Sequence, residues 1–360
     1  MIPYGHQHVD DDDIEAVVKV LRGDWLTQGP AVEDFEQKLA ACCEARYAVA
    51  FASGTAALHA AAAATGLGTG DLVVTSPLTF AASANAARYV GATVDLRDID
   101  PTTLNIDLAG VGAGVDGLVA VHFAGLPLDL TALAHRPRVV IEDAAHAIGA
   151  ATPDGPVGNC AHSDATIFSF HPVKTLTTGE GGAATTNDPD LAERLRRFRN
   201  HGVVRLPDEG GWAYDVADLG CNYRLSDIHA ALGRSQLEKL DTDLAHREVF
   251  ARRYDSLLSD LAVTTPPAAP AGWVHGRHLY PIRVADRRRV YDELRGAGIG
   301  VQVHYRPIHH HSAFADIDPE RHRFPHAEAA YRELLSLPLF PDLGFDRQDL
   351  VVAALRAALR

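Results

Sequence analysis

Residues 169–182, Ser-Phe-His-Pro-Val-Lys-Thr-Leu-Thr-Thr-Gly-Glu-Gly-Gly, determine how the rest of the sequence is interpreted. The run that leads into them, 165–170, is rich in β-branched and aromatic residues and predicts a buried strand. Lys174 follows Pro172 in a segment too rich in threonine and glycine for a helix. A lysine on a turn after a buried strand can lose its water, which disfavours the ammonium form and leaves a nucleophilic amine. The alternative is an ordinary lysine of a surface loop, and position alone does not separate the two.

Lysine is rare in this chain, which makes Lys174 stand out. Lys19, Lys38 and Lys239 are the other lysines, and each lies in an amphipathic helical pattern. We expect those three to be solvated charges, because arginine carries most of the remaining positive charge.

Composition bounds the class of protein. The chain has 360 residues, 47% hydrophobic and 22% charged, which is typical of a globular protein with a large core. The formal net charge of −14 argues against a nucleic-acid partner. The four cysteines lack metal-ligand spacing and favour reduced thiols in a cytoplasmic protein. The sequence shows no signal-peptide pattern, and its alanine-rich run at 56–64 is too short to cross a bilayer, so we expect a soluble protein without a membrane partner.

Short apolar runs alternate with helical patterns from residue 47 onward. This alternation predicts an α/β fold with a mostly parallel sheet covered by helices. The expected strands are 47–52, 71–76, 93–96, 117–122, 139–142, 165–170 and 183–186. The expected helices are 30–43, 54–65, 81–89, 191–198, 225–240 and 243–261. Four aspartates, 10–13, precede a further helical pattern, where carboxylates favour a helix N-terminus more than a metal site.

The C-terminal part has a different pattern. A Pro/Ala-rich segment, 264–272, interrupts the alternation. We therefore expect a large domain over 1–245 and a smaller α+β domain over 246–360. In the smaller domain we expect strands at 279–284 and 301–305, a helix at 287–297 and two closing helices. Residues 201–222 are expected to form an irregular loop over the site.

Ligands gather at the carboxyl ends of strands in such sheets. That rule selects the residues after each strand and predicts that they converge. The selected residues are Ser53 to Thr55, Pro77 to Phe80, Phe123 to Gly125, Asp143 to His146, and Lys174.

Asp143 and Lys174 together suggest a specific chemistry. An aspartate can ion-pair with a protonated ring nitrogen while a lysine holds the same ring covalently, which is the protein's part in pyridoxal 5′-phosphate (PLP) chemistry. Gly54, between a strand and a helix, would let backbone N–H groups approach a phosphate. Phe80 could stack on a planar cofactor. Taken singly, Asp143 could instead be a helix cap, Gly54 a simple turn, and Phe80 a core residue.

Five motifs in this order resemble the DegT/DnrJ/StrS-type nucleotide-sugar aminotransferases, from Tyr4 almost to the C-terminus. The motifs are Ser-Gly-Thr-Ala-Ala (53–57), Glu-Asp-Ala-Ala-His-Ala-Ile-Gly (142–149), the lysine segment (169–182), Leu-Gly-Cys-Asn-Tyr-Arg-Leu (219–225) and Val-His-Tyr-Arg-Pro (303–307). The lysine segment together with Glu-Asp-x-x-His is highly specific.

The resemblance implies the PLP-dependent transferase fold type I and a homodimer whose active sites are shared between subunits. It implies that Lys174 is the catalytic lysine that binds the cofactor and that Asp143 pairs with the pyridine nitrogen. The other cofactor-binding residues implied are His146 beside the 3-oxygen, Phe80 on the ring, Gly54, Thr55, Ala56 and Ser169 at the phosphate, and Asn222 from the other subunit. The residues implied to face the nucleotide sugar are Tyr4, Trp25, Leu26, Thr27, Gln28, Tyr305 and His309.

Within the family, residues 24–30, 121–125 and 170–174 are most similar to the pseudaminic acid branch. That branch uses L-glutamate to aminate C4 of a UDP-linked 4-keto-6-deoxy-N-acetylhexosamine, with the cofactor cycling through pyridoxamine 5′-phosphate (PMP). The sequence departs from the branch at Leu78, Leu126 and Leu128 and is shorter between Asp107 and Asp116. These departures leave open a different UDP-, GDP- or dTDP-linked keto sugar.

Three other functions compete with this interpretation. A related PLP-dependent dehydratase would carry histidine in place of Lys174. A non-catalytic regulator would not need the Lys174–Asp143 pair. A metalloenzyme could use His309 to His311 with His304, but three adjacent histidines on a strand do not all point one way, so we expect no metal.

Overall fold

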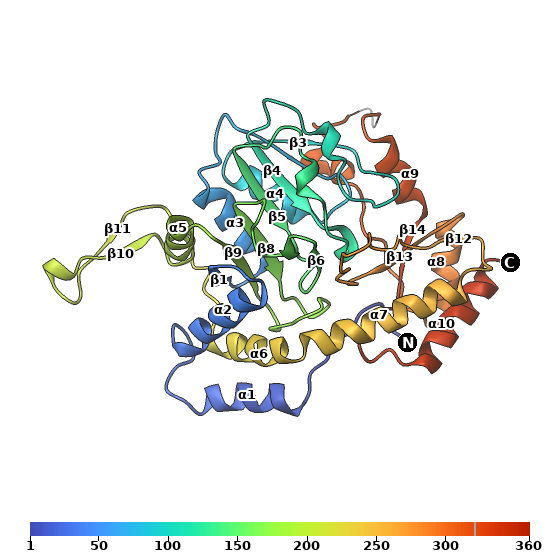
Figure 1. Cartoon of the computed structure of the whole chain (residues 1–360), viewed down its shortest axis with the longest axis horizontal. Helices are drawn as coiled ribbons and strands as arrows, with labels where there is room; N and C mark the ends of the chain where they lie inside the picture. Colours follow the sequence, from blue (N-terminus) through green and yellow to red (C-terminus); the bar gives the residue numbers. More distant parts are fainter. Residues whose placement is uncertain (320–321) are drawn as a thin grey trace.

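The centre of the protein is a seven-stranded sheet with the order β1-β9-β8-β5-β4-β2-β3, seen in a computed structural model that describes residues 1–319 and 322–360 (Figure 1). Its strands are β1 (Tyr47–Phe51), β2 (Leu72–Thr75), β3 (Thr93–Leu96), β4 (Gly117–Val121), β5 (Val139–Asp143), β8 (Ala165–Ser169) and β9 (Gly182–Thr186). β2, β3, β4, β5 and β8 pair in parallel, whereas β9 is antiparallel to both β1 and β8. The predicted mostly parallel sheet is confirmed.

Helices cover both faces of this sheet, because its strands are apolar on both sides. In β1, Val49 and Phe51 pack into one buried cluster, while Ala48 and Ala50 pack into another, as the two-residue period of a strand requires. The first cluster contains α3 (Gly54–Ala64), α4 (Ala81–Tyr89) and α5 (Pro189–Arg199). The second contains α2 (Pro30–Cys42) and α6 (Asp227–Glu238).

The N-terminal helix α1 (Asp11–Leu21) is fixed to the rest of the fold by its acidic start. Asp10 caps it, with reciprocal hydrogen bonds to Asp13, so the interpretation of residues 10–13 as a helix N-terminus is confirmed. Asp13 is completely buried and contacts the Lys239 amine at 2.5 Å. The expectation that Lys239 is a solvated charge is therefore wrong, because the residue at the junction of α6 and α7 (Leu240–Leu257) pairs with two carboxylates of the N-terminus.

The C-terminal part contains a three-stranded antiparallel sheet of β12 (Val263–Thr264), β13 (Tyr280–Val284) and β14 (Leu334–Leu337). α7, α8 (Arg287–Gly296) and α10 (Phe345–Ala358) pack with it in a core of their own. α9 (Pro325–Glu333) packs instead with the cluster on α3 and α4. The proposed boundary at 245/246 falls inside the continuous helix α7, and the division into 1–245 and 246–360 stays a prediction.

Two elements of the C-terminal part differ from expectation. Residues 301–305 form no strand, because the backbone there makes a single isolated bridge, between Gln302 and Ser336. Gly300 N–H instead donates to the carbonyl of Ile2 at the N-terminus. Leu334–Leu337 is a strand that the sequence did not reveal, and the two closing helices are α9 and α10 as expected.

Residues 201–222 are more regular than predicted. They contain a hairpin of β10 (Val203–Arg205) and β11 (Tyr214–Val216), which extends away from the rest of the chain (Figure 1). β6 (Ala151–Thr152) and β7 (Gly155–Pro156) form a second small hairpin. Among the helices of residues 1–319 and 322–360, none has the length and apolar character needed to cross a membrane.

Candidate active site

The residues selected by the strand ends converge on one cavity of about 380 Å³. Its wall includes Ser53, Gly54, Thr55, Thr79, Phe80, Asp143, His146, Ser169 and Lys174, together with Tyr4, His278, His304 and Tyr305 from outside the large sheet. The volume is within the range of small-molecule sites. The expected convergence holds for nine of the selected residues, because Pro77, Leu78, Ala144 and Phe123 to Gly125 do not line the cavity. The functional roles of the lining residues stay predictions.

Lys174 lies on the turn that follows β8. Its backbone N–H donates to the carbonyl of His171, which closes the turn, and its side chain reaches the cavity. Burial lowers the pKa of the Lys174 amine to about 8, and the Asp143 carboxylate opposes part of that shift. A far larger fraction of this amine is neutral near pH 7 than of an ordinary lysine, as the sequence led us to expect.

Asp143 is the last residue of β5 and is held by two donors. One oxygen accepts a 2.6 Å hydrogen bond from the Ser83 hydroxyl, and the other accepts from the Ala145 N–H at 3.2 Å. Ser83 in turn shares a 2.9 Å hydrogen bond with Thr79. The carboxylate is 6% exposed and therefore enters the cavity in a fixed orientation with little competition from water.

The N-terminus of α3 forms one end of the cavity. Ser53 caps the helix by accepting from the Ala56 N–H at 3.1 Å, so that N–H is already used, and Ala56 does not line the cavity. Gly54 and Thr55 do line it. A Cβ at Gly54 would lie 2.8 Å from the Cβ of Ser169, so glycine is what lets the helix start approach β8 this closely. A helix N-terminus with free N–H groups and neighbouring hydroxyls is suited to an anion such as phosphate.

His146 and Tyr305 form the opposite wall. The Tyr305 hydroxyl and His146 Nε2 are 2.9 Å apart, and the two rings stack with centroids 5.9 Å apart. Burial, and then the nearby Lys174 amine, lower the pKa of His146 well below its usual value, so the ring is neutral. Phe80 is 62% exposed at the cavity and is not a core residue.

The other residues implied by the resemblance divide into two groups. Tyr4 lines the cavity, whereas Trp25, Leu26, Thr27, Gln28, Asn222 and His309 do not. The Trp25–Gln28 loop and Asn222 are exposed, and Gln28 borders a separate hollow with Arg196, Arg199 and Arg224. His309 is buried against Glu328. The assigned roles of these residues stay predictions.

Sequence reasoning missed two residues at this site, Ser83 and His278, and gave His304 no role in it. Ser83 fixes Asp143, and its spacing of four residues from Thr79 at the start of α4 was the available signal. His278 lies with its ring centroid 4.4 Å from that of His146, and His304 bonds to Ser336 at 2.9 Å. His278 reaches the site through tertiary contact with His146, so no local pattern indicated it, whereas His304 belongs to the motif at residues 303–307.

Comparison with known proteins bears directly on this geometry. The sequence pattern of the DegT/DnrJ/EryC1/StrS aminotransferase family matches residues 7–356. The chain belongs to this family. The PLP-dependent sugar aminotransferase activity and fold type I that the sequence predicted are therefore confirmed.

Three relatives illustrate the breadth of the family. The aminotransferase is 36% identical to the Bacillus subtilis spore coat polysaccharide biosynthesis protein SpsC, over 99% of this chain and 96% of that protein. It is 36% identical to a Campylobacter jejuni UDP-4-amino-4,6-dideoxy-N-acetyl-β-L-altrosamine transaminase, over 96% and 94% of the two chains. A Streptococcus pneumoniae protein described as a sugar aminotransferase, Spr1654, in its PMP form, superposes with a TM-score of 0.93 at 27% identity, covering 99% of each chain.

The aminotransferase uses PLP, and its cavity fits that cofactor. The cavity has a buried Lys174 amine with a lowered pKa and an Asp143 carboxylate held in place by Ser83. At its helix start, Gly54 has no Cβ, so nothing there collides with Ser169. These three features match the carbonyl carbon, the pyridine nitrogen and the phosphate of PLP in chemical type.

Proposed function

We propose that the enzyme transfers the amino group of L-glutamate to the C4 keto group of UDP-2-acetamido-2,6-dideoxy-β-L-arabino-hex-4-ulose, in a pathway of the pseudaminic acid type. The observation that carries the proposal is the buried Lys174 amine, with a pKa lowered to about 8, in one cavity with Asp143. The sugar is supported by the Campylobacter jejuni relative, whose name specifies an amino sugar of this kind.

Each residue of the cavity has a distinct part in this reaction. Bound PLP supplies an electron-withdrawing ring that stabilises negative charge at the carbon losing its proton. Lys174 would bind the cofactor, and its neutral amine, when free, would accept and return that proton. Asp143 would keep the pyridine nitrogen protonated by charge pairing. Ser53 to Thr55 and Ser169 would hold the phosphate, and Phe80 would cover a face of the ring.

The departures at Leu78, Leu126 and Leu128 bear on the choice of sugar. Leu78 and Leu126 are buried at 0% and 4% exposure, and none of the three lines the cavity. These three leucines therefore leave the wall of this cavity unchanged, so they give no reason to exclude the sugar of the branch. The alternative substrate is another UDP-, GDP- or dTDP-linked sugar with its keto group at C4 or C3. We retain this alternative because an equally similar relative is named for spore coat polysaccharide biosynthesis.

The test is a panel of UDP-, GDP- and dTDP-linked 4-keto-6-deoxy sugars with L-glutamate as donor. Product mass would identify amination, and NMR couplings at C4 would give the stereochemistry. Turnover of the UDP-N-acetyl sugar at least tenfold faster than the others is expected. Preference for a GDP or dTDP sugar would replace the proposed substrate, and no turnover of any keto sugar would refute the function.

We also propose a homodimer in which Asn222 of one subunit completes the site of the other. Asn222 is exposed, lies outside the cavity of its own chain and follows β11 of the hairpin by six residues. That hairpin carries Trp212 and Tyr214 at 82% and 59% exposure, as expected of a surface that packs on a partner.

Subunit mixing tests this dimer. Lys174→Ala and Asn222→Ala variants would each be inactive or impaired alone. If the sites are shared, unfolding, mixing and refolding the two gives hybrid dimers with one intact site, so about a quarter of wild-type activity returns. If Asn222 serves its own subunit, mixing restores nothing.

The proposed location is the cytoplasm. All four cysteines are free thiols, including the buried Cys43 and Cys160. Reduced thiols are typical of a reducing compartment. Localisation of a tagged chain by cell fractionation would test the assignment.

A further inference from the structure

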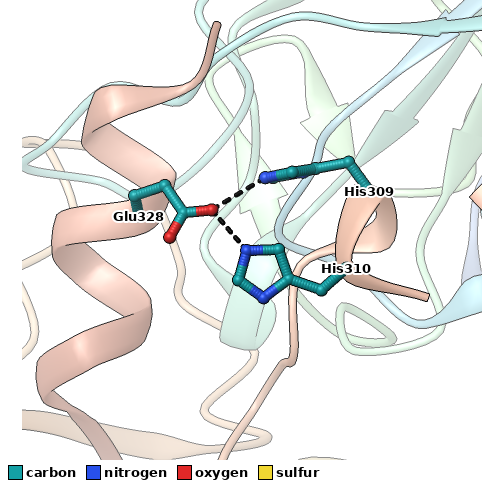
Figure 2. Close-up of side chains that lie close together, drawn as sticks. All are labelled: His309, His310 and Glu328. Carbon is teal, nitrogen blue, oxygen red and sulfur yellow. Dashed lines mark hydrogen bonds and ion pairs between the residues drawn. The ribbon is translucent and has the colours of Figure 1, made fainter. Parts of the chain in front are cut away.

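Two histidines and a glutamate converge at a place outside the catalytic cavity. His309 and His310 lie on the short 3₁₀ turn η5 (Ile308–His310), and Glu328 lies in the first turn of α9. Nε2 of His309 is 2.8 Å, and Nε2 of His310 is 2.5 Å, from the same Glu328 oxygen. Figure 2 shows both imidazole rings directed at the carboxylate from the facing segment. One ligand atom from each residue lies within 4.8 Å of the other two.

The backbone conformation explains why the sequence argued against this arrangement. On an extended strand, adjacent side chains point to opposite faces, so a run of histidines would diverge. On the 3₁₀ turn, the rings of His309 and His310 are almost perpendicular, at 82° with centroids 4.7 Å apart, and both reach Glu328. His311, the third histidine of the run, is not part of the cluster.

The cluster is shielded from water on most sides. The side chains of His309, His310 and Glu328 are 0%, 9% and 18% exposed. Phe324 packs on His309 with ring centroids 4.9 Å apart, and Tyr331 packs on His310 at 5.4 Å. The arrangement is therefore built by packing, because its ligand atoms are held by buried rings and not by mobile surface side chains.

The hydrogen bonding leaves the His309 ring free to change its tautomer. Within the described residues, Nδ1 of His309 is buried and has no hydrogen-bond partner. Glu328 is the one partner, among residues 1–319 and 322–360, that keeps the proton on Nε2 of His309. If that proton moved to Nδ1, Nε2 would present a lone pair toward the centre of the cluster. Across the part of the chain that the structure describes, Nδ1 lacks a hydrogen-bond partner in either tautomer, so the change would cost no existing hydrogen bond at that atom.

We propose that His309, His310 and Glu328 bind one divalent transition-metal ion of the zinc type. Two imidazoles and one carboxylate form a ligand set that zinc prefers, with a fourth position for water at the exposed edge of Glu328. The ion would take the place of the two Nε2 protons of His309 and His310, which now face one oxygen of Glu328. The ion would join η5 to α9. It would thereby stiffen the segment between His309 and Tyr305, which lines the catalytic cavity four residues before His309.

Zinc binding by the PLP-loaded enzyme tests the proposal. After treatment with a chelator, the enzyme is dialysed against buffered zinc, and bound metal is measured by mass spectrometry. One zinc per chain is expected, with a melting temperature that rises with zinc concentration. His310→Ala and Glu328→Gln should weaken binding by about 100-fold or more, since even loss of an outer contact costs 10- to 100-fold. His311→Ala is the matched control and should bind like the wild type.

Controls separate this site from the other histidines, since the chain has nineteen. The visible absorbance of bound PLP reports whether each variant is folded, and Glu328→Gln preserves the size of the side chain if His310→Ala does not fold. Zinc bound equally by all variants would mean adventitious surface binding and would overturn the proposal. Absence of bound zinc in the wild type at micromolar free metal would overturn it as well.

Discussion

The lowered pKa of Lys174 predicts how fast the apoenzyme captures PLP at each pH. Only the neutral amine attacks the cofactor, and burial brings its pKa to about 8, against an ordinary value of 10.5. At pH 7 the neutral fraction is then about one tenth, compared with about 0.03% for an ordinary lysine, a gain of roughly 300-fold. The rate of covalent capture should rise about tenfold per pH unit below pH 8 and level off above it.

Stopped-flow absorbance of the apoenzyme mixed with PLP between pH 6 and 10 measures this profile. Nα-acetyl-lysine with PLP is the control, and its rate should keep rising beyond pH 10, because its amine is fully solvated. Asp143→Asn should move the midpoint to lower pH, since the Asp143 carboxylate raises the Lys174 pKa. A rate that climbs without a break to pH 10, or a midpoint that moves upward in Asp143→Asn, would refute the reasoning.

The same shift predicts a pH-dependent stability of the apoenzyme. Between about pH 8 and 10.5 the unfolded chain keeps its lysine proton while the folded chain has lost it, so wild-type stability rises with pH across this window. Lys174→Met removes the cost of burying the ammonium group. Urea unfolding should therefore show a gain of up to about 3 kcal/mol below pH 8 that disappears by pH 10.5. An equal gain at both pH values would contradict the assignment.

Two substitutions probe packing, one at the cofactor-binding end of the cavity and one away from it. Gly54→Ala places a Cβ 2.8 Å from the Cβ of Ser169. It should lower the free energy of unfolding by about 1–3 kcal/mol and weaken PLP binding, measured by absorbance titration. Gly112→Ala is the control and should change neither quantity, because a Cβ there meets nothing within 4 Å. Lys239→Met leaves the buried Asp13 carboxylate without its cation and should cost about 3 kcal/mol in urea unfolding. Lys38→Met removes only an exposed ion pair and should cost less than about 1 kcal/mol. Equal losses in the two lysine variants would show that Asp13 does not depend on the Lys239 charge.

The carboxyl edge of the sheet could be located from the sequence because it follows from topology. Parallel pairing brings together the ends of the strands before Phe80, Asp143 and Lys174. The strand before Ser53 runs in the same direction as β8, because both are antiparallel to β9. The lowered pKa of Lys174 follows from the same placement. The positions of these residues could therefore be predicted without knowing how side chains pack.

The parts that escaped prediction depend on contacts between distant segments. Residues 301–305 have the pattern of a strand, but the N-terminal Ile2 binds the adjoining backbone, so no ladder forms. Leu334–Leu337 is an apolar run too short for its period to distinguish strand from helix. His309 and His310 converge only because the chain turns tightly at that point, and neighbouring sequence gives no sign of Glu328.

The reversed strand β9 has a consequence for the diversity of such enzymes. Because it lies beside β8, the connection that carries Lys174 returns directly to the adjacent strand, and Phe170 and Gly181 at its two ends are joined by a backbone hydrogen bond. The Thr177 hydroxyl also bonds to the Phe170 carbonyl from within it. The reactive amine is thus carried by a short closed loop of fixed span, while the segments proposed to contact the sugar come from other parts of the chain. Evolution can therefore exchange those segments, and with them the substrate, without displacing the amine.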